Sequence, residues 1–310
     1  MENKLTSTEL QEIVKSKKNA IKTGGAVFSC IMLIPVLFHF LVFYCGVNLG
    51  TILLAFTTPT PDGEVLSLVN FKNFFAEMGR PDSQIFLALS NTLQHYLWGQ
   101  IKFAVTCLVA YFFYKKIYGH KIYKVIFFLP SMVPGMVYIS IFKNMITVYG
   151  PIDMMMKSVF GTGLPALMST PKLAEGTIIF YAFWAGFGTQ LLINVGAMNR
   201  IPEDVIDAAK LDGCIGFKEF WYIVFPLVFE TIATYFLLGI ASIFQANAPF
   251  LFFVGSDMGE IHTLSYWIFT QTRGGASNYP AAIGLITTVV TLPLVILTRW
   301  LINKVDTVTY

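Results

Sequence analysis

The sequence predicts an all-α integral membrane protein with six transmembrane helices. Hydrophobic residues make up 55% of the 310 residues and charged residues only 13%, about half the charged share of an ordinary soluble domain. Apolar runs of about 20 residues, the length that crosses a ~30 Å hydrocarbon core at 1.5 Å per residue, recur along the chain. The six candidate spans are 26–56, 93–114, 125–142, 177–198, 223–244 and 281–302.

The first span follows a polar, lysine-rich segment at residues 1–25. A cleavable signal peptide needs a shorter apolar core and a small-residue cleavage site, and neither is apparent here. We therefore expect an uncleaved first transmembrane helix, long enough to tilt or to extend beyond the bilayer, with a kink at Pro35.

The third span is short and carries Pro130 and Pro134, so its start should be irregular. Interrupted backbone at membrane depth is tolerated mainly where it is buried in protein or lines a cavity. This makes the third span a candidate for part of a translocation path.

The lysine and arginine residues predict the orientation. With the N-terminus in the cytoplasm, thirteen of the 21 lie in inner segments and six in outer ones, which favours both termini inside. The outer connections 57–92, 143–176 and 245–280 are each too short for a sizeable domain. An amphipathic piece at 68–78 is expected to lie along the outer surface.

A polar segment lies between the fourth and fifth apolar runs, on the cytoplasmic side in this orientation. Pro202 suits the first position of a helix, and acidic residues then complement the helix dipole. Gly213 can adopt the left-handed conformation that ends the helix. A second short helix from about residue 217 should run into Pro226 and bury Phe217, Phe220 and Trp221. The candidate residues of this helix–turn–helix are Pro202, Glu203, Asp207, Ala208, Ala209, Asp212, Gly213, Ile223 and Pro226.

An interfacial loop that touches only lipid headgroups is the alternative interpretation of this segment. Such a loop needs basic residues facing the lipid, whereas Glu203, Asp204 and Asp207 make the first helix net acidic. Ala208 and Ala209 would keep one face small enough for another protein to approach. The segment therefore predicts a docking element for a protein partner.

The spacing of this segment resembles the EAA loop, E-A-A-x3-G-x9-I-x-L-P, of the membrane subunits of ABC importers. Asp207 replaces the Glu and Phe225 replaces the Leu, while Ala208, Ala209, Gly213, Ile223 and Pro226 match. The residues upstream of the loop and in the spans resemble the carbohydrate branch, the maltose and multiple-sugar type. These further similarities are Ile201-Pro202-Glu203-Asp204, Phe128-Leu129-Pro130, Val133-Pro134, Ile141-Phe142, Tyr149-Gly150-Pro151-Ile152-Asp153 and Phe183-Trp184-Ala185-Gly186.

The resemblance runs from about residue 87 to the C-terminus and implies a type I ABC importer permease fold. It implies a permease domain at 87–305 that includes a coupling loop at 200–226, preceded by a first helix and outer loop at 26–86 and followed by a tail at 306–310. It further implies a subunit of the bacterial cell membrane that pairs with a second homologous permease. Two ATP-binding subunits, which hold the ATP and Mg, and an extracytoplasmic sugar-binding protein would complete an importer of an oligosaccharide.

The chain lacks the residues of an enzyme or of a cofactor site. No G-x-x-x-x-G-K-[ST], H-E-x-x-H or G-x-S-x-G occurs, so no catalytic residue, bound nucleotide or metal is expected. The four cysteines suit neither a disulfide framework nor a zinc site. The net charge of +3 gives no indication of a nucleic-acid partner. Membrane lipid is expected to surround the apolar spans.

One alternative within the same class and two from other classes remain. An ABC permease could carry another solute, such as a glycerophosphodiester or a polyamine. A proton-coupled secondary transporter usually has buried ionisable residues in a relay, but here the charged residues within the spans are few, Lys102, Glu230 and Arg299. An intramembrane enzyme is disfavoured more strongly by the absence of a catalytic motif.

Small and polar residues on the third, fourth and fifth spans predict the path of the solute. Sugar recognition needs hydroxyl and amide groups beside aromatic faces, with small residues that leave room. Close helix packing and hydrogen bonds across helices explain the same pattern equally well. The candidate residues are Ser131, Gly135, Tyr138, Trp184, Gly186, Thr189, Gln190, Gly239, Ser242, Gln245 and Asn247.

Overall fold

A computed structural model describes residues 25, 27–61, 63–245 and 259–304. Its contacts divide the chain into two compact units, Met1–Ser67 and Leu68–Tyr310. The division falls earlier in the chain than the boundary after residue 86 that the sequence suggests, because α3 packs with the second unit.

The first unit is an apolar helix followed by a β-hairpin. The helix spans Val27–Ala55, contains a π-helical segment η1 (Phe40–Gly46) and ends in α2 (Val47–Ala55). Its apolar side chains are exposed on all sides, as expected for a helix surrounded by lipid. The helix continues through Pro35. Its irregular part is the π-helical segment η1, which begins five residues later.

Strands β1 (Thr57–Thr60) and β2 (Gly63–Leu66) pair antiparallel, with Thr57 opposite Leu66 and Thr60 opposite Gly63. The sequence analysis did not predict this hairpin. Its signal was the sequence Pro61-Asp62-Gly63, which is typical of a turn between two strands. Pro61 and Asp62 connect the paired residues Thr60 and Gly63, and Gly63 has a φ of +126°.

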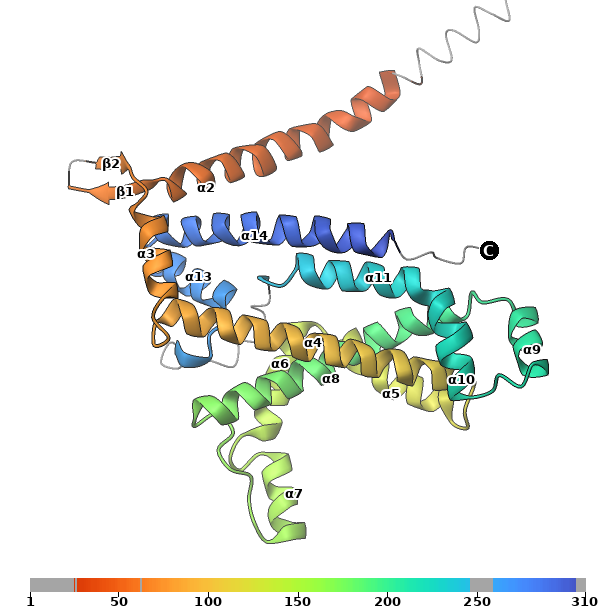
Figure 1. Cartoon of the computed structure of the whole chain (residues 1–310). Helices are drawn as coiled ribbons and strands as arrows, with labels where there is room; N and C mark the ends of the chain where they lie inside the picture. Colours follow the sequence, from red (N-terminus) through yellow and green to blue (C-terminus); the bar gives the residue numbers. More distant parts are fainter. Residues whose placement is uncertain (1–24, 26, 62, 246–258, 305–310) are drawn as a thin grey trace, which may run out of the picture. The chain divides into compact units, whose positions relative to one another are not determined.

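The second unit contains the remaining described helices, in the order shown in Figure 1. It begins with α3 (Val69–Met78), α4 (Gln84–Tyr114), α5 (His120–Met132), α6 (Gly135–Ile146), α7 (Pro151–Phe160) and α8 (Pro171–Met198). It continues with α9 (Glu203–Leu211), α10 (Phe217–Glu219), the π-helical η2 (Phe220–Val224), α11 (Phe225–Ala241), the 3₁₀ turn η3 (Gly259–Ile261), α13 (Leu264–Arg273) and α14 (Asn278–Ile302).

Among the described residues, five helices are long and apolar enough to cross a membrane, and a sixth span is present if a bent pair counts as one. They correspond to the six predicted spans, although the helices begin earlier than their apolar cores. For example, α4 begins at Gln84, where the hydroxyl of Ser83 accepts a hydrogen bond from the Phe86 N–H at 3.1 Å. An N-cap of this kind starts a helix independently of hydropathy.

The bent pair is the predicted third span, and its break lies at mid-span rather than at its start. Helix α5 includes Pro130 and ends at Met132; Val133 and Pro134 are extended, and the two helical arms meet at 105°. A residue that precedes proline is disfavoured in the helical conformation, which explains why Val133 ends α5. Ser131 therefore lies on a different helix from Gly135 and Tyr138, not on one stripe with them.

Helix α8 packs against α4 and α5, and α11 lies against α4, α8 and α14 (Figure 1). One buried cluster, which includes Tyr111, Leu191 and Phe220, joins α4, α8 and the start of α11. A second cluster around Tyr138, Phe142 and Tyr181 joins α6 to α8. Helix α8 thus contributes to both clusters.

Gly188 permits the closest approach between α8 and α5. A Cβ atom at this position would overlap the carbonyl oxygen of Phe127 and lie 2.8 Å from the Cα atom of Phe128. Helix packing therefore explains the glycine at position 188. The atoms that a side chain would overlap belong to the backbone of α5, which cannot move aside as the end of a flexible side chain can.

We predict that Gly188→Ala destabilises the protein by about 1–3 kcal/mol, as overpacking typically does. The midpoint of thermal unfolding in detergent should fall. Gly196→Ala is the matched control on the same helix, because a Cβ atom there meets no atom within 4 Å. Equal melting temperatures for the two variants would contradict the close approach.

Candidate functional site

Helix α9 ends in the left-handed turn that the sequence predicts. Gly213 has a φ of +74°; its N–H donates to the Lys210 carbonyl at 3.0 Å, and the Cys214 N–H donates to the Ala209 carbonyl at 2.8 Å. This pair of bonds is the Schellman arrangement that closes a helix C-terminus. At the other end Pro202 lies one position before the helix rather than at its first residue.

The second helix of the 200–226 segment differs from the expected short helix. It is one helical run from Phe217 to Ala241 and contains the π-helical η2. Pro226 has no N–H to offer to the Tyr222 carbonyl, and in the adjoining turn the Phe225 N–H bonds instead to the carbonyl of Phe220. Only Phe220 of the three predicted aromatic residues is buried, because Phe217 and Trp221 lie on the outer side of this helix.

A buried ion pair holds this second helix to α4. The Nζ atom of Lys115 lies 2.9 Å and 3.0 Å from the two carboxylate oxygens of Glu219, which is fully buried. One turn earlier in α4, the Tyr111 hydroxyl donates to the carbonyl of Gly216 at 2.8 Å. Neither contact was predicted from the sequence; the available signal was an acidic residue, Glu219, directly before the six consecutive apolar and aromatic residues 220–225.

The two alanines of α9 do not share one exposed face. Ala209 is buried together with Ile206, so the predicted small face of two alanines is reduced to Ala208, which is exposed. The exposed surface beyond the helix is apolar instead: Leu211 is 89% exposed and Ile215 65% exposed. We call Leu211 and Ile215 the exposed apolar pair; the sequence signal was an isoleucine and a leucine flanking the glycine stop.

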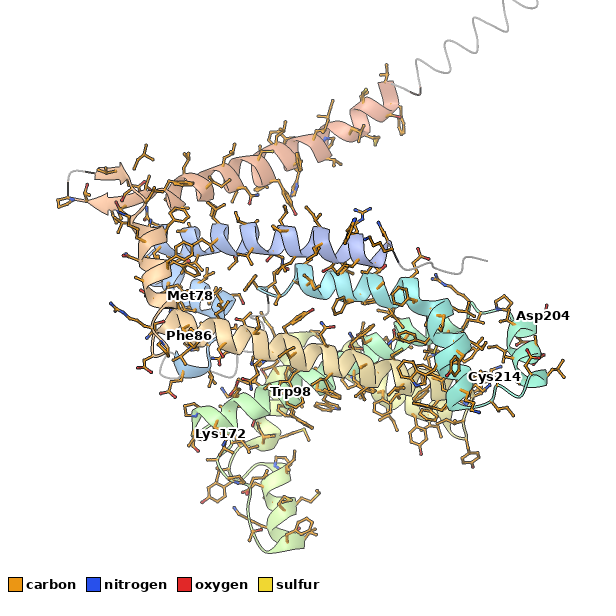
Figure 2. All side chains as sticks on the ribbon, viewed as in Figure 1. Met78, Phe86, Trp98, Lys172, Asp204 and Cys214 are labelled. Carbon is orange, nitrogen blue, oxygen red and sulfur yellow. The ribbon has the colours of Figure 1, made fainter. Side chains whose placement is uncertain are left out.

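A groove of about 340 Å³ separates α9 from the end of α4, and charged side chains line it, including Lys115, Lys116, Glu203, Asp207 and Lys210. Asp207 accepts a hydrogen bond from Lys210 at 2.8 Å, which raises the pKa of that lysine above its usual value. Exposed pairs of this kind contribute little stability. Asp204 and Cys214 mark the segment in Figure 2. Asp212 is the C-cap of α9 and is exposed, whereas Ile223 and Pro226 are partly buried.

The predicted path residues on the fourth and fifth spans, α8 and α11, include two glycines that lie beside α4. A Cβ atom at Gly186 would lie 2.6 Å from Nζ of Lys102, and one at Gly239 would lie 3.0 Å from Nε2 of Gln100 and 3.7 Å from the Tyr96 ring. These α4 residues were absent from the predicted path. Their signal was the recurrence of polar side chains at positions 96 and 100, one helical turn apart, in an otherwise apolar span.

Tyr138 and Trp184 are brought together, with ring centroids 4.9 Å apart, and Tyr138 also contacts Tyr181 at 5.6 Å. Tyr138 is buried in this aromatic cluster, so it packs α6 against α8. On α5, the Ser131 hydroxyl donates to the carbonyl of Phe128 at 2.7 Å.

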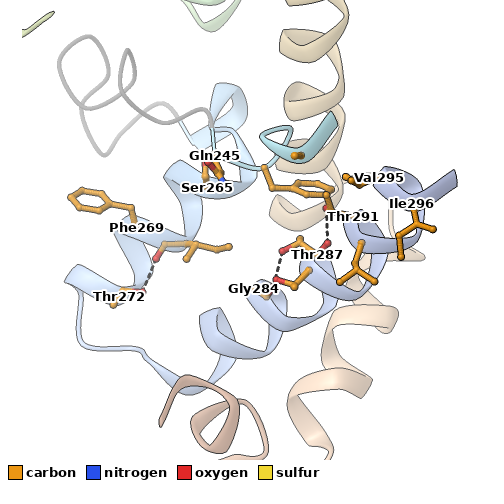
Figure 3. Close-up of a pocket in the computed structure, with 14 residues that line it drawn as sticks. Gln245, Ser265, Phe269, Thr272, Gly284, Thr287, Thr291, Val295 and Ile296 are labelled. Atoms are coloured by element: carbon orange, nitrogen blue, oxygen red, sulfur yellow. Dashed lines mark hydrogen bonds between the residues drawn. The ribbon is translucent and has the colours of Figure 1, made fainter. Parts of the chain in front are cut away.

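A further pocket of about 920 Å³ lies between the end of α11, α13 and α14 (Figure 3). Gln245 is the predicted path residue that lines it. Hydroxyl groups from α13 and α14 line it as well, among them Ser265, whose buried oxygen has no hydrogen-bond partner within the described residues. Thr287 and Thr288 donate to the carbonyl of Gly284 at 2.8 Å and retain free acceptor lone pairs.

The other path residues lie on partly or fully open surfaces. Thr189 and Ser242 are exposed, as is Gly135 at the start of α6, and Gln190 is partly buried with a carbonyl oxygen that has no partner in the part of the chain that the structure describes. Asn247 lies outside the described residues. The described residues contain no group of three or more His, Cys, Asp or Glu side chains that could hold a metal ion, and all four cysteines are free.

Comparisons with known proteins identify the class. Residues 102–307 match the family model "binding-protein-dependent transport system inner membrane component". The maltose/maltodextrin transport system permease protein MalF of Salmonella typhimurium is 30% identical over 166 residues, which cover 52% of this chain and 32% of that protein. MalF of Klebsiella aerogenes is 31% identical over the same length, with the same coverage. The chain thus spans only a minor part of these relatives.

Two solved structures share the fold. One is a bacterial ABC transporter involved in the import of the acidic polysaccharide alginate, with a TM-score of 0.79 at 19% identity over 94% of this chain and 99% of that one. The other is a bacterial alginate ABC transporter in complex with an alginate pentasaccharide-bound periplasmic protein, with a TM-score of 0.75 at 18% identity over 90% and 94% of the two chains.

The chain is therefore a multi-pass membrane protein with the fold of an ABC importer permease. It belongs to the family of inner-membrane components of binding-protein-dependent transport systems.

We predict that Lys115→Met loosens the 200–226 segment. Removing the cation leaves the carboxylate of Glu219 buried and unpaired, which should lower the free energy of unfolding by about 2–4 kcal/mol. This is somewhat less than for a fully enclosed ion pair, because 30% of the Lys115 side chain is exposed. Amide hydrogen exchange should accelerate throughout residues 203–219. Lys116→Met is the control, since its exposed neighbouring side chain forms no ion pair within the described residues. Unchanged exchange in Lys115→Met would show that the pair does not hold the segment.

Proposed function

We propose that this chain is a permease subunit of an ATP-driven ABC importer for an oligosaccharide. It would form the transmembrane path with a second, homologous permease, and an extracytoplasmic binding protein would deliver the sugar. The observation that carries the proposal is the 200–226 segment, whose EAA-type spacing folds into α9 with a left-handed glycine stop inside the region that the family model matches. The sugar class is supported by the maltose permeases among the relatives.

The proposed role of the 200–226 segment is to couple the permease to two ATP-binding subunits on the cytoplasmic side. Helix α9 would dock in a cleft of an ATP-binding subunit, and the exposed apolar pair, Leu211 and Ile215, would enter that contact. Exposed apolar side chains on a monomer commonly mark such interfaces. Both ATP and Mg would be bound by these partners, and this chain would catalyse nothing.

Movement of α9 would reach the membrane helices by two connections. The ion pair between Lys115 and Glu219 joins the base of the segment to α4, and the continuous helix from Phe217 joins it to α11. Closure of the ATP-binding subunits would therefore displace α4 and α11 together, and tip the path from inward to outward opening. This requires the 200–226 segment and both termini to lie in the cytoplasm.

The proposed path of the sugar runs beside α8 and α11, where Gly186 and Gly239 meet the polar side chains of α4. Gln190 offers an acceptor there, and Gln245 leads to the hydroxyl-lined pocket of Figure 3. Hydroxyl and amide groups beside aromatic rings are the groups that a sugar site requires. Tyr138 and Trp184 would support the side of the path by packing against each other. At these two positions we therefore favour helix packing over direct contact with the sugar.

Reconstitution tests the proposed function. Purification through this chain should recover a second permease and an ATPase, and vesicles that contain this complex should take up oligosaccharide only when ATP is inside and the binding protein outside. Uptake without the binding protein, or driven by an ion gradient without ATP, would refute the importer.

We predict that Leu211→Ser weakens ATPase docking without affecting the fold. The side chain is 89% exposed, so the substitution removes no internal packing, whereas loss of a central interface side chain lowers affinity roughly tenfold or more. The measurement is sugar-stimulated ATP hydrolysis as a function of ATPase concentration. Tyr118→Ser is the control, because Tyr118 is fully exposed on the neighbouring connection between α4 and α5. Equal effects of the two substitutions would exclude a specific contact at Leu211.

A further inference from the structure

Lys102 places a cation deep within a membrane-spanning helix. It lies 18 residues after the start of α4 and 12 residues before its end, which corresponds to about 27 Å and about 18 Å of helix. Within the apolar span 93–114 it lies about 14 Å and about 18 Å from the two ends. A lysine side chain reaches only about 6 Å, so the ammonium group cannot extend to either membrane surface in the way that lysines near helix ends do. The charge must therefore be satisfied at this depth.

The part of the chain that the structure describes supplies no counter-ion for this charge. Within the described residues, ion pairs join Lys115 to Glu219, Lys157 to Asp153 and Lys210 to Asp207, and Lys102 takes part in none. Glu230, the acidic residue of α11, is exposed and forms no ion pair with it. An ionisable residue inside a membrane protein that lacks an internal partner typically faces the pathway of a polar solute.

The surroundings of Lys102 are those of a ligand site. Its Nζ atom occupies the space beside Gly186 that a side chain would otherwise fill, 2.6 Å from the position of a Cβ atom. Gln190, one helical turn further along α8 from Gly186, has a buried carbonyl oxygen that has no hydrogen-bond partner among the described residues. A cation beside Gly186 and an unused acceptor on the next turn of α8 match a molecule that carries both a carboxylate and hydroxyl groups.

We propose that Lys102 binds the carboxylate of an acidic oligosaccharide, so that the solute consists of carboxylated sugars such as uronic acids. This inference rests on the proposed function and narrows it to a substrate class. The carboxylate would accept hydrogen bonds from the ammonium group, and a neighbouring sugar hydroxyl would donate to Gln190. A neutral sugar would leave the charge of Lys102 unpaired, so the path favours the acidic one.

The test uses the whole complex in vesicles with its binding protein and two probes of equal length, a uronic-acid oligosaccharide and its carboxyl-reduced, neutral analogue. The wild type should take up the acidic probe at least about tenfold faster, as expected for a charge-assisted contact. Lys102→Met should lose this preference by slowing the acidic probe alone. Lys102→Arg, which keeps the charge, should retain it, and subunit assembly should stay unchanged in both variants.

Three other outcomes would overturn the inference. If Lys102→Met slows both probes equally and impairs assembly or basal ATP hydrolysis, the carboxylate belongs to the second permease rather than to the solute. If Lys102→Met changes nothing, Lys102 does not contact the solute. If the wild type prefers the neutral probe, the proposed importer stands and the acidic substrate class fails; if it takes up neither probe, the proposed sugar transport itself fails.

Discussion

The carboxylate of Glu219 is fully buried, and its pairing with Lys115 constrains the whole region around it. An unpaired charge in that position would be strongly unfavourable, so the start of the second helix has to stay against the end of α4. The Tyr111 hydroxyl fixes the adjoining Gly216 carbonyl in the same way. Helix α9 is connected to this base by a few residues between two positive-φ glycines, Gly213 and Gly216. A protruding helix on an anchored base is suited to transmit displacement rather than to absorb it.

The sequence predicted those parts of the fold that local chemistry determines. Long apolar runs gave the spans, and the glycine after α9 gave the helix stop, because both effects act within a few residues. The prediction that the third span is irregular at its start was wrong, since the break lies at Val133 in the middle of the span. Helix α5 accommodates Pro130, whereas the residue before Pro134 is disfavoured in the helical conformation. The Lys115–Glu219 pair joins residues far apart in sequence, so the position of Glu219 before an apolar run indicated its burial but not its partner.

The candidate path shows why small residues could not be assigned from spacing alone. Gly186 and Gly239 do permit close packing, since side chains of α4 occupy the space beside them. Those same side chains are polar, so close packing brings Lys102 and Gln100 to the wall between α4, α8 and α11. Helix packing and the proposed recognition of the solute thus involve the same contacts at these two positions. Tyr138 and Trp184, in contrast, contact each other within an aromatic cluster.

The π-helical η2 sets the direction in which α11 presents its side chains. A wider turn holds one more residue than an α-helical turn, and one residue corresponds to about 100° of rotation around a helix axis. Every side chain after Val224 therefore points in a different direction around the helix axis from the one that a regular α-helix starting at Phe217 would give it. Shortening η2 by one residue would turn Gly239 away from Gln100 without altering the hydropathy of the span, so an insertion or deletion there would act on the phase of the helix and not on its membrane insertion.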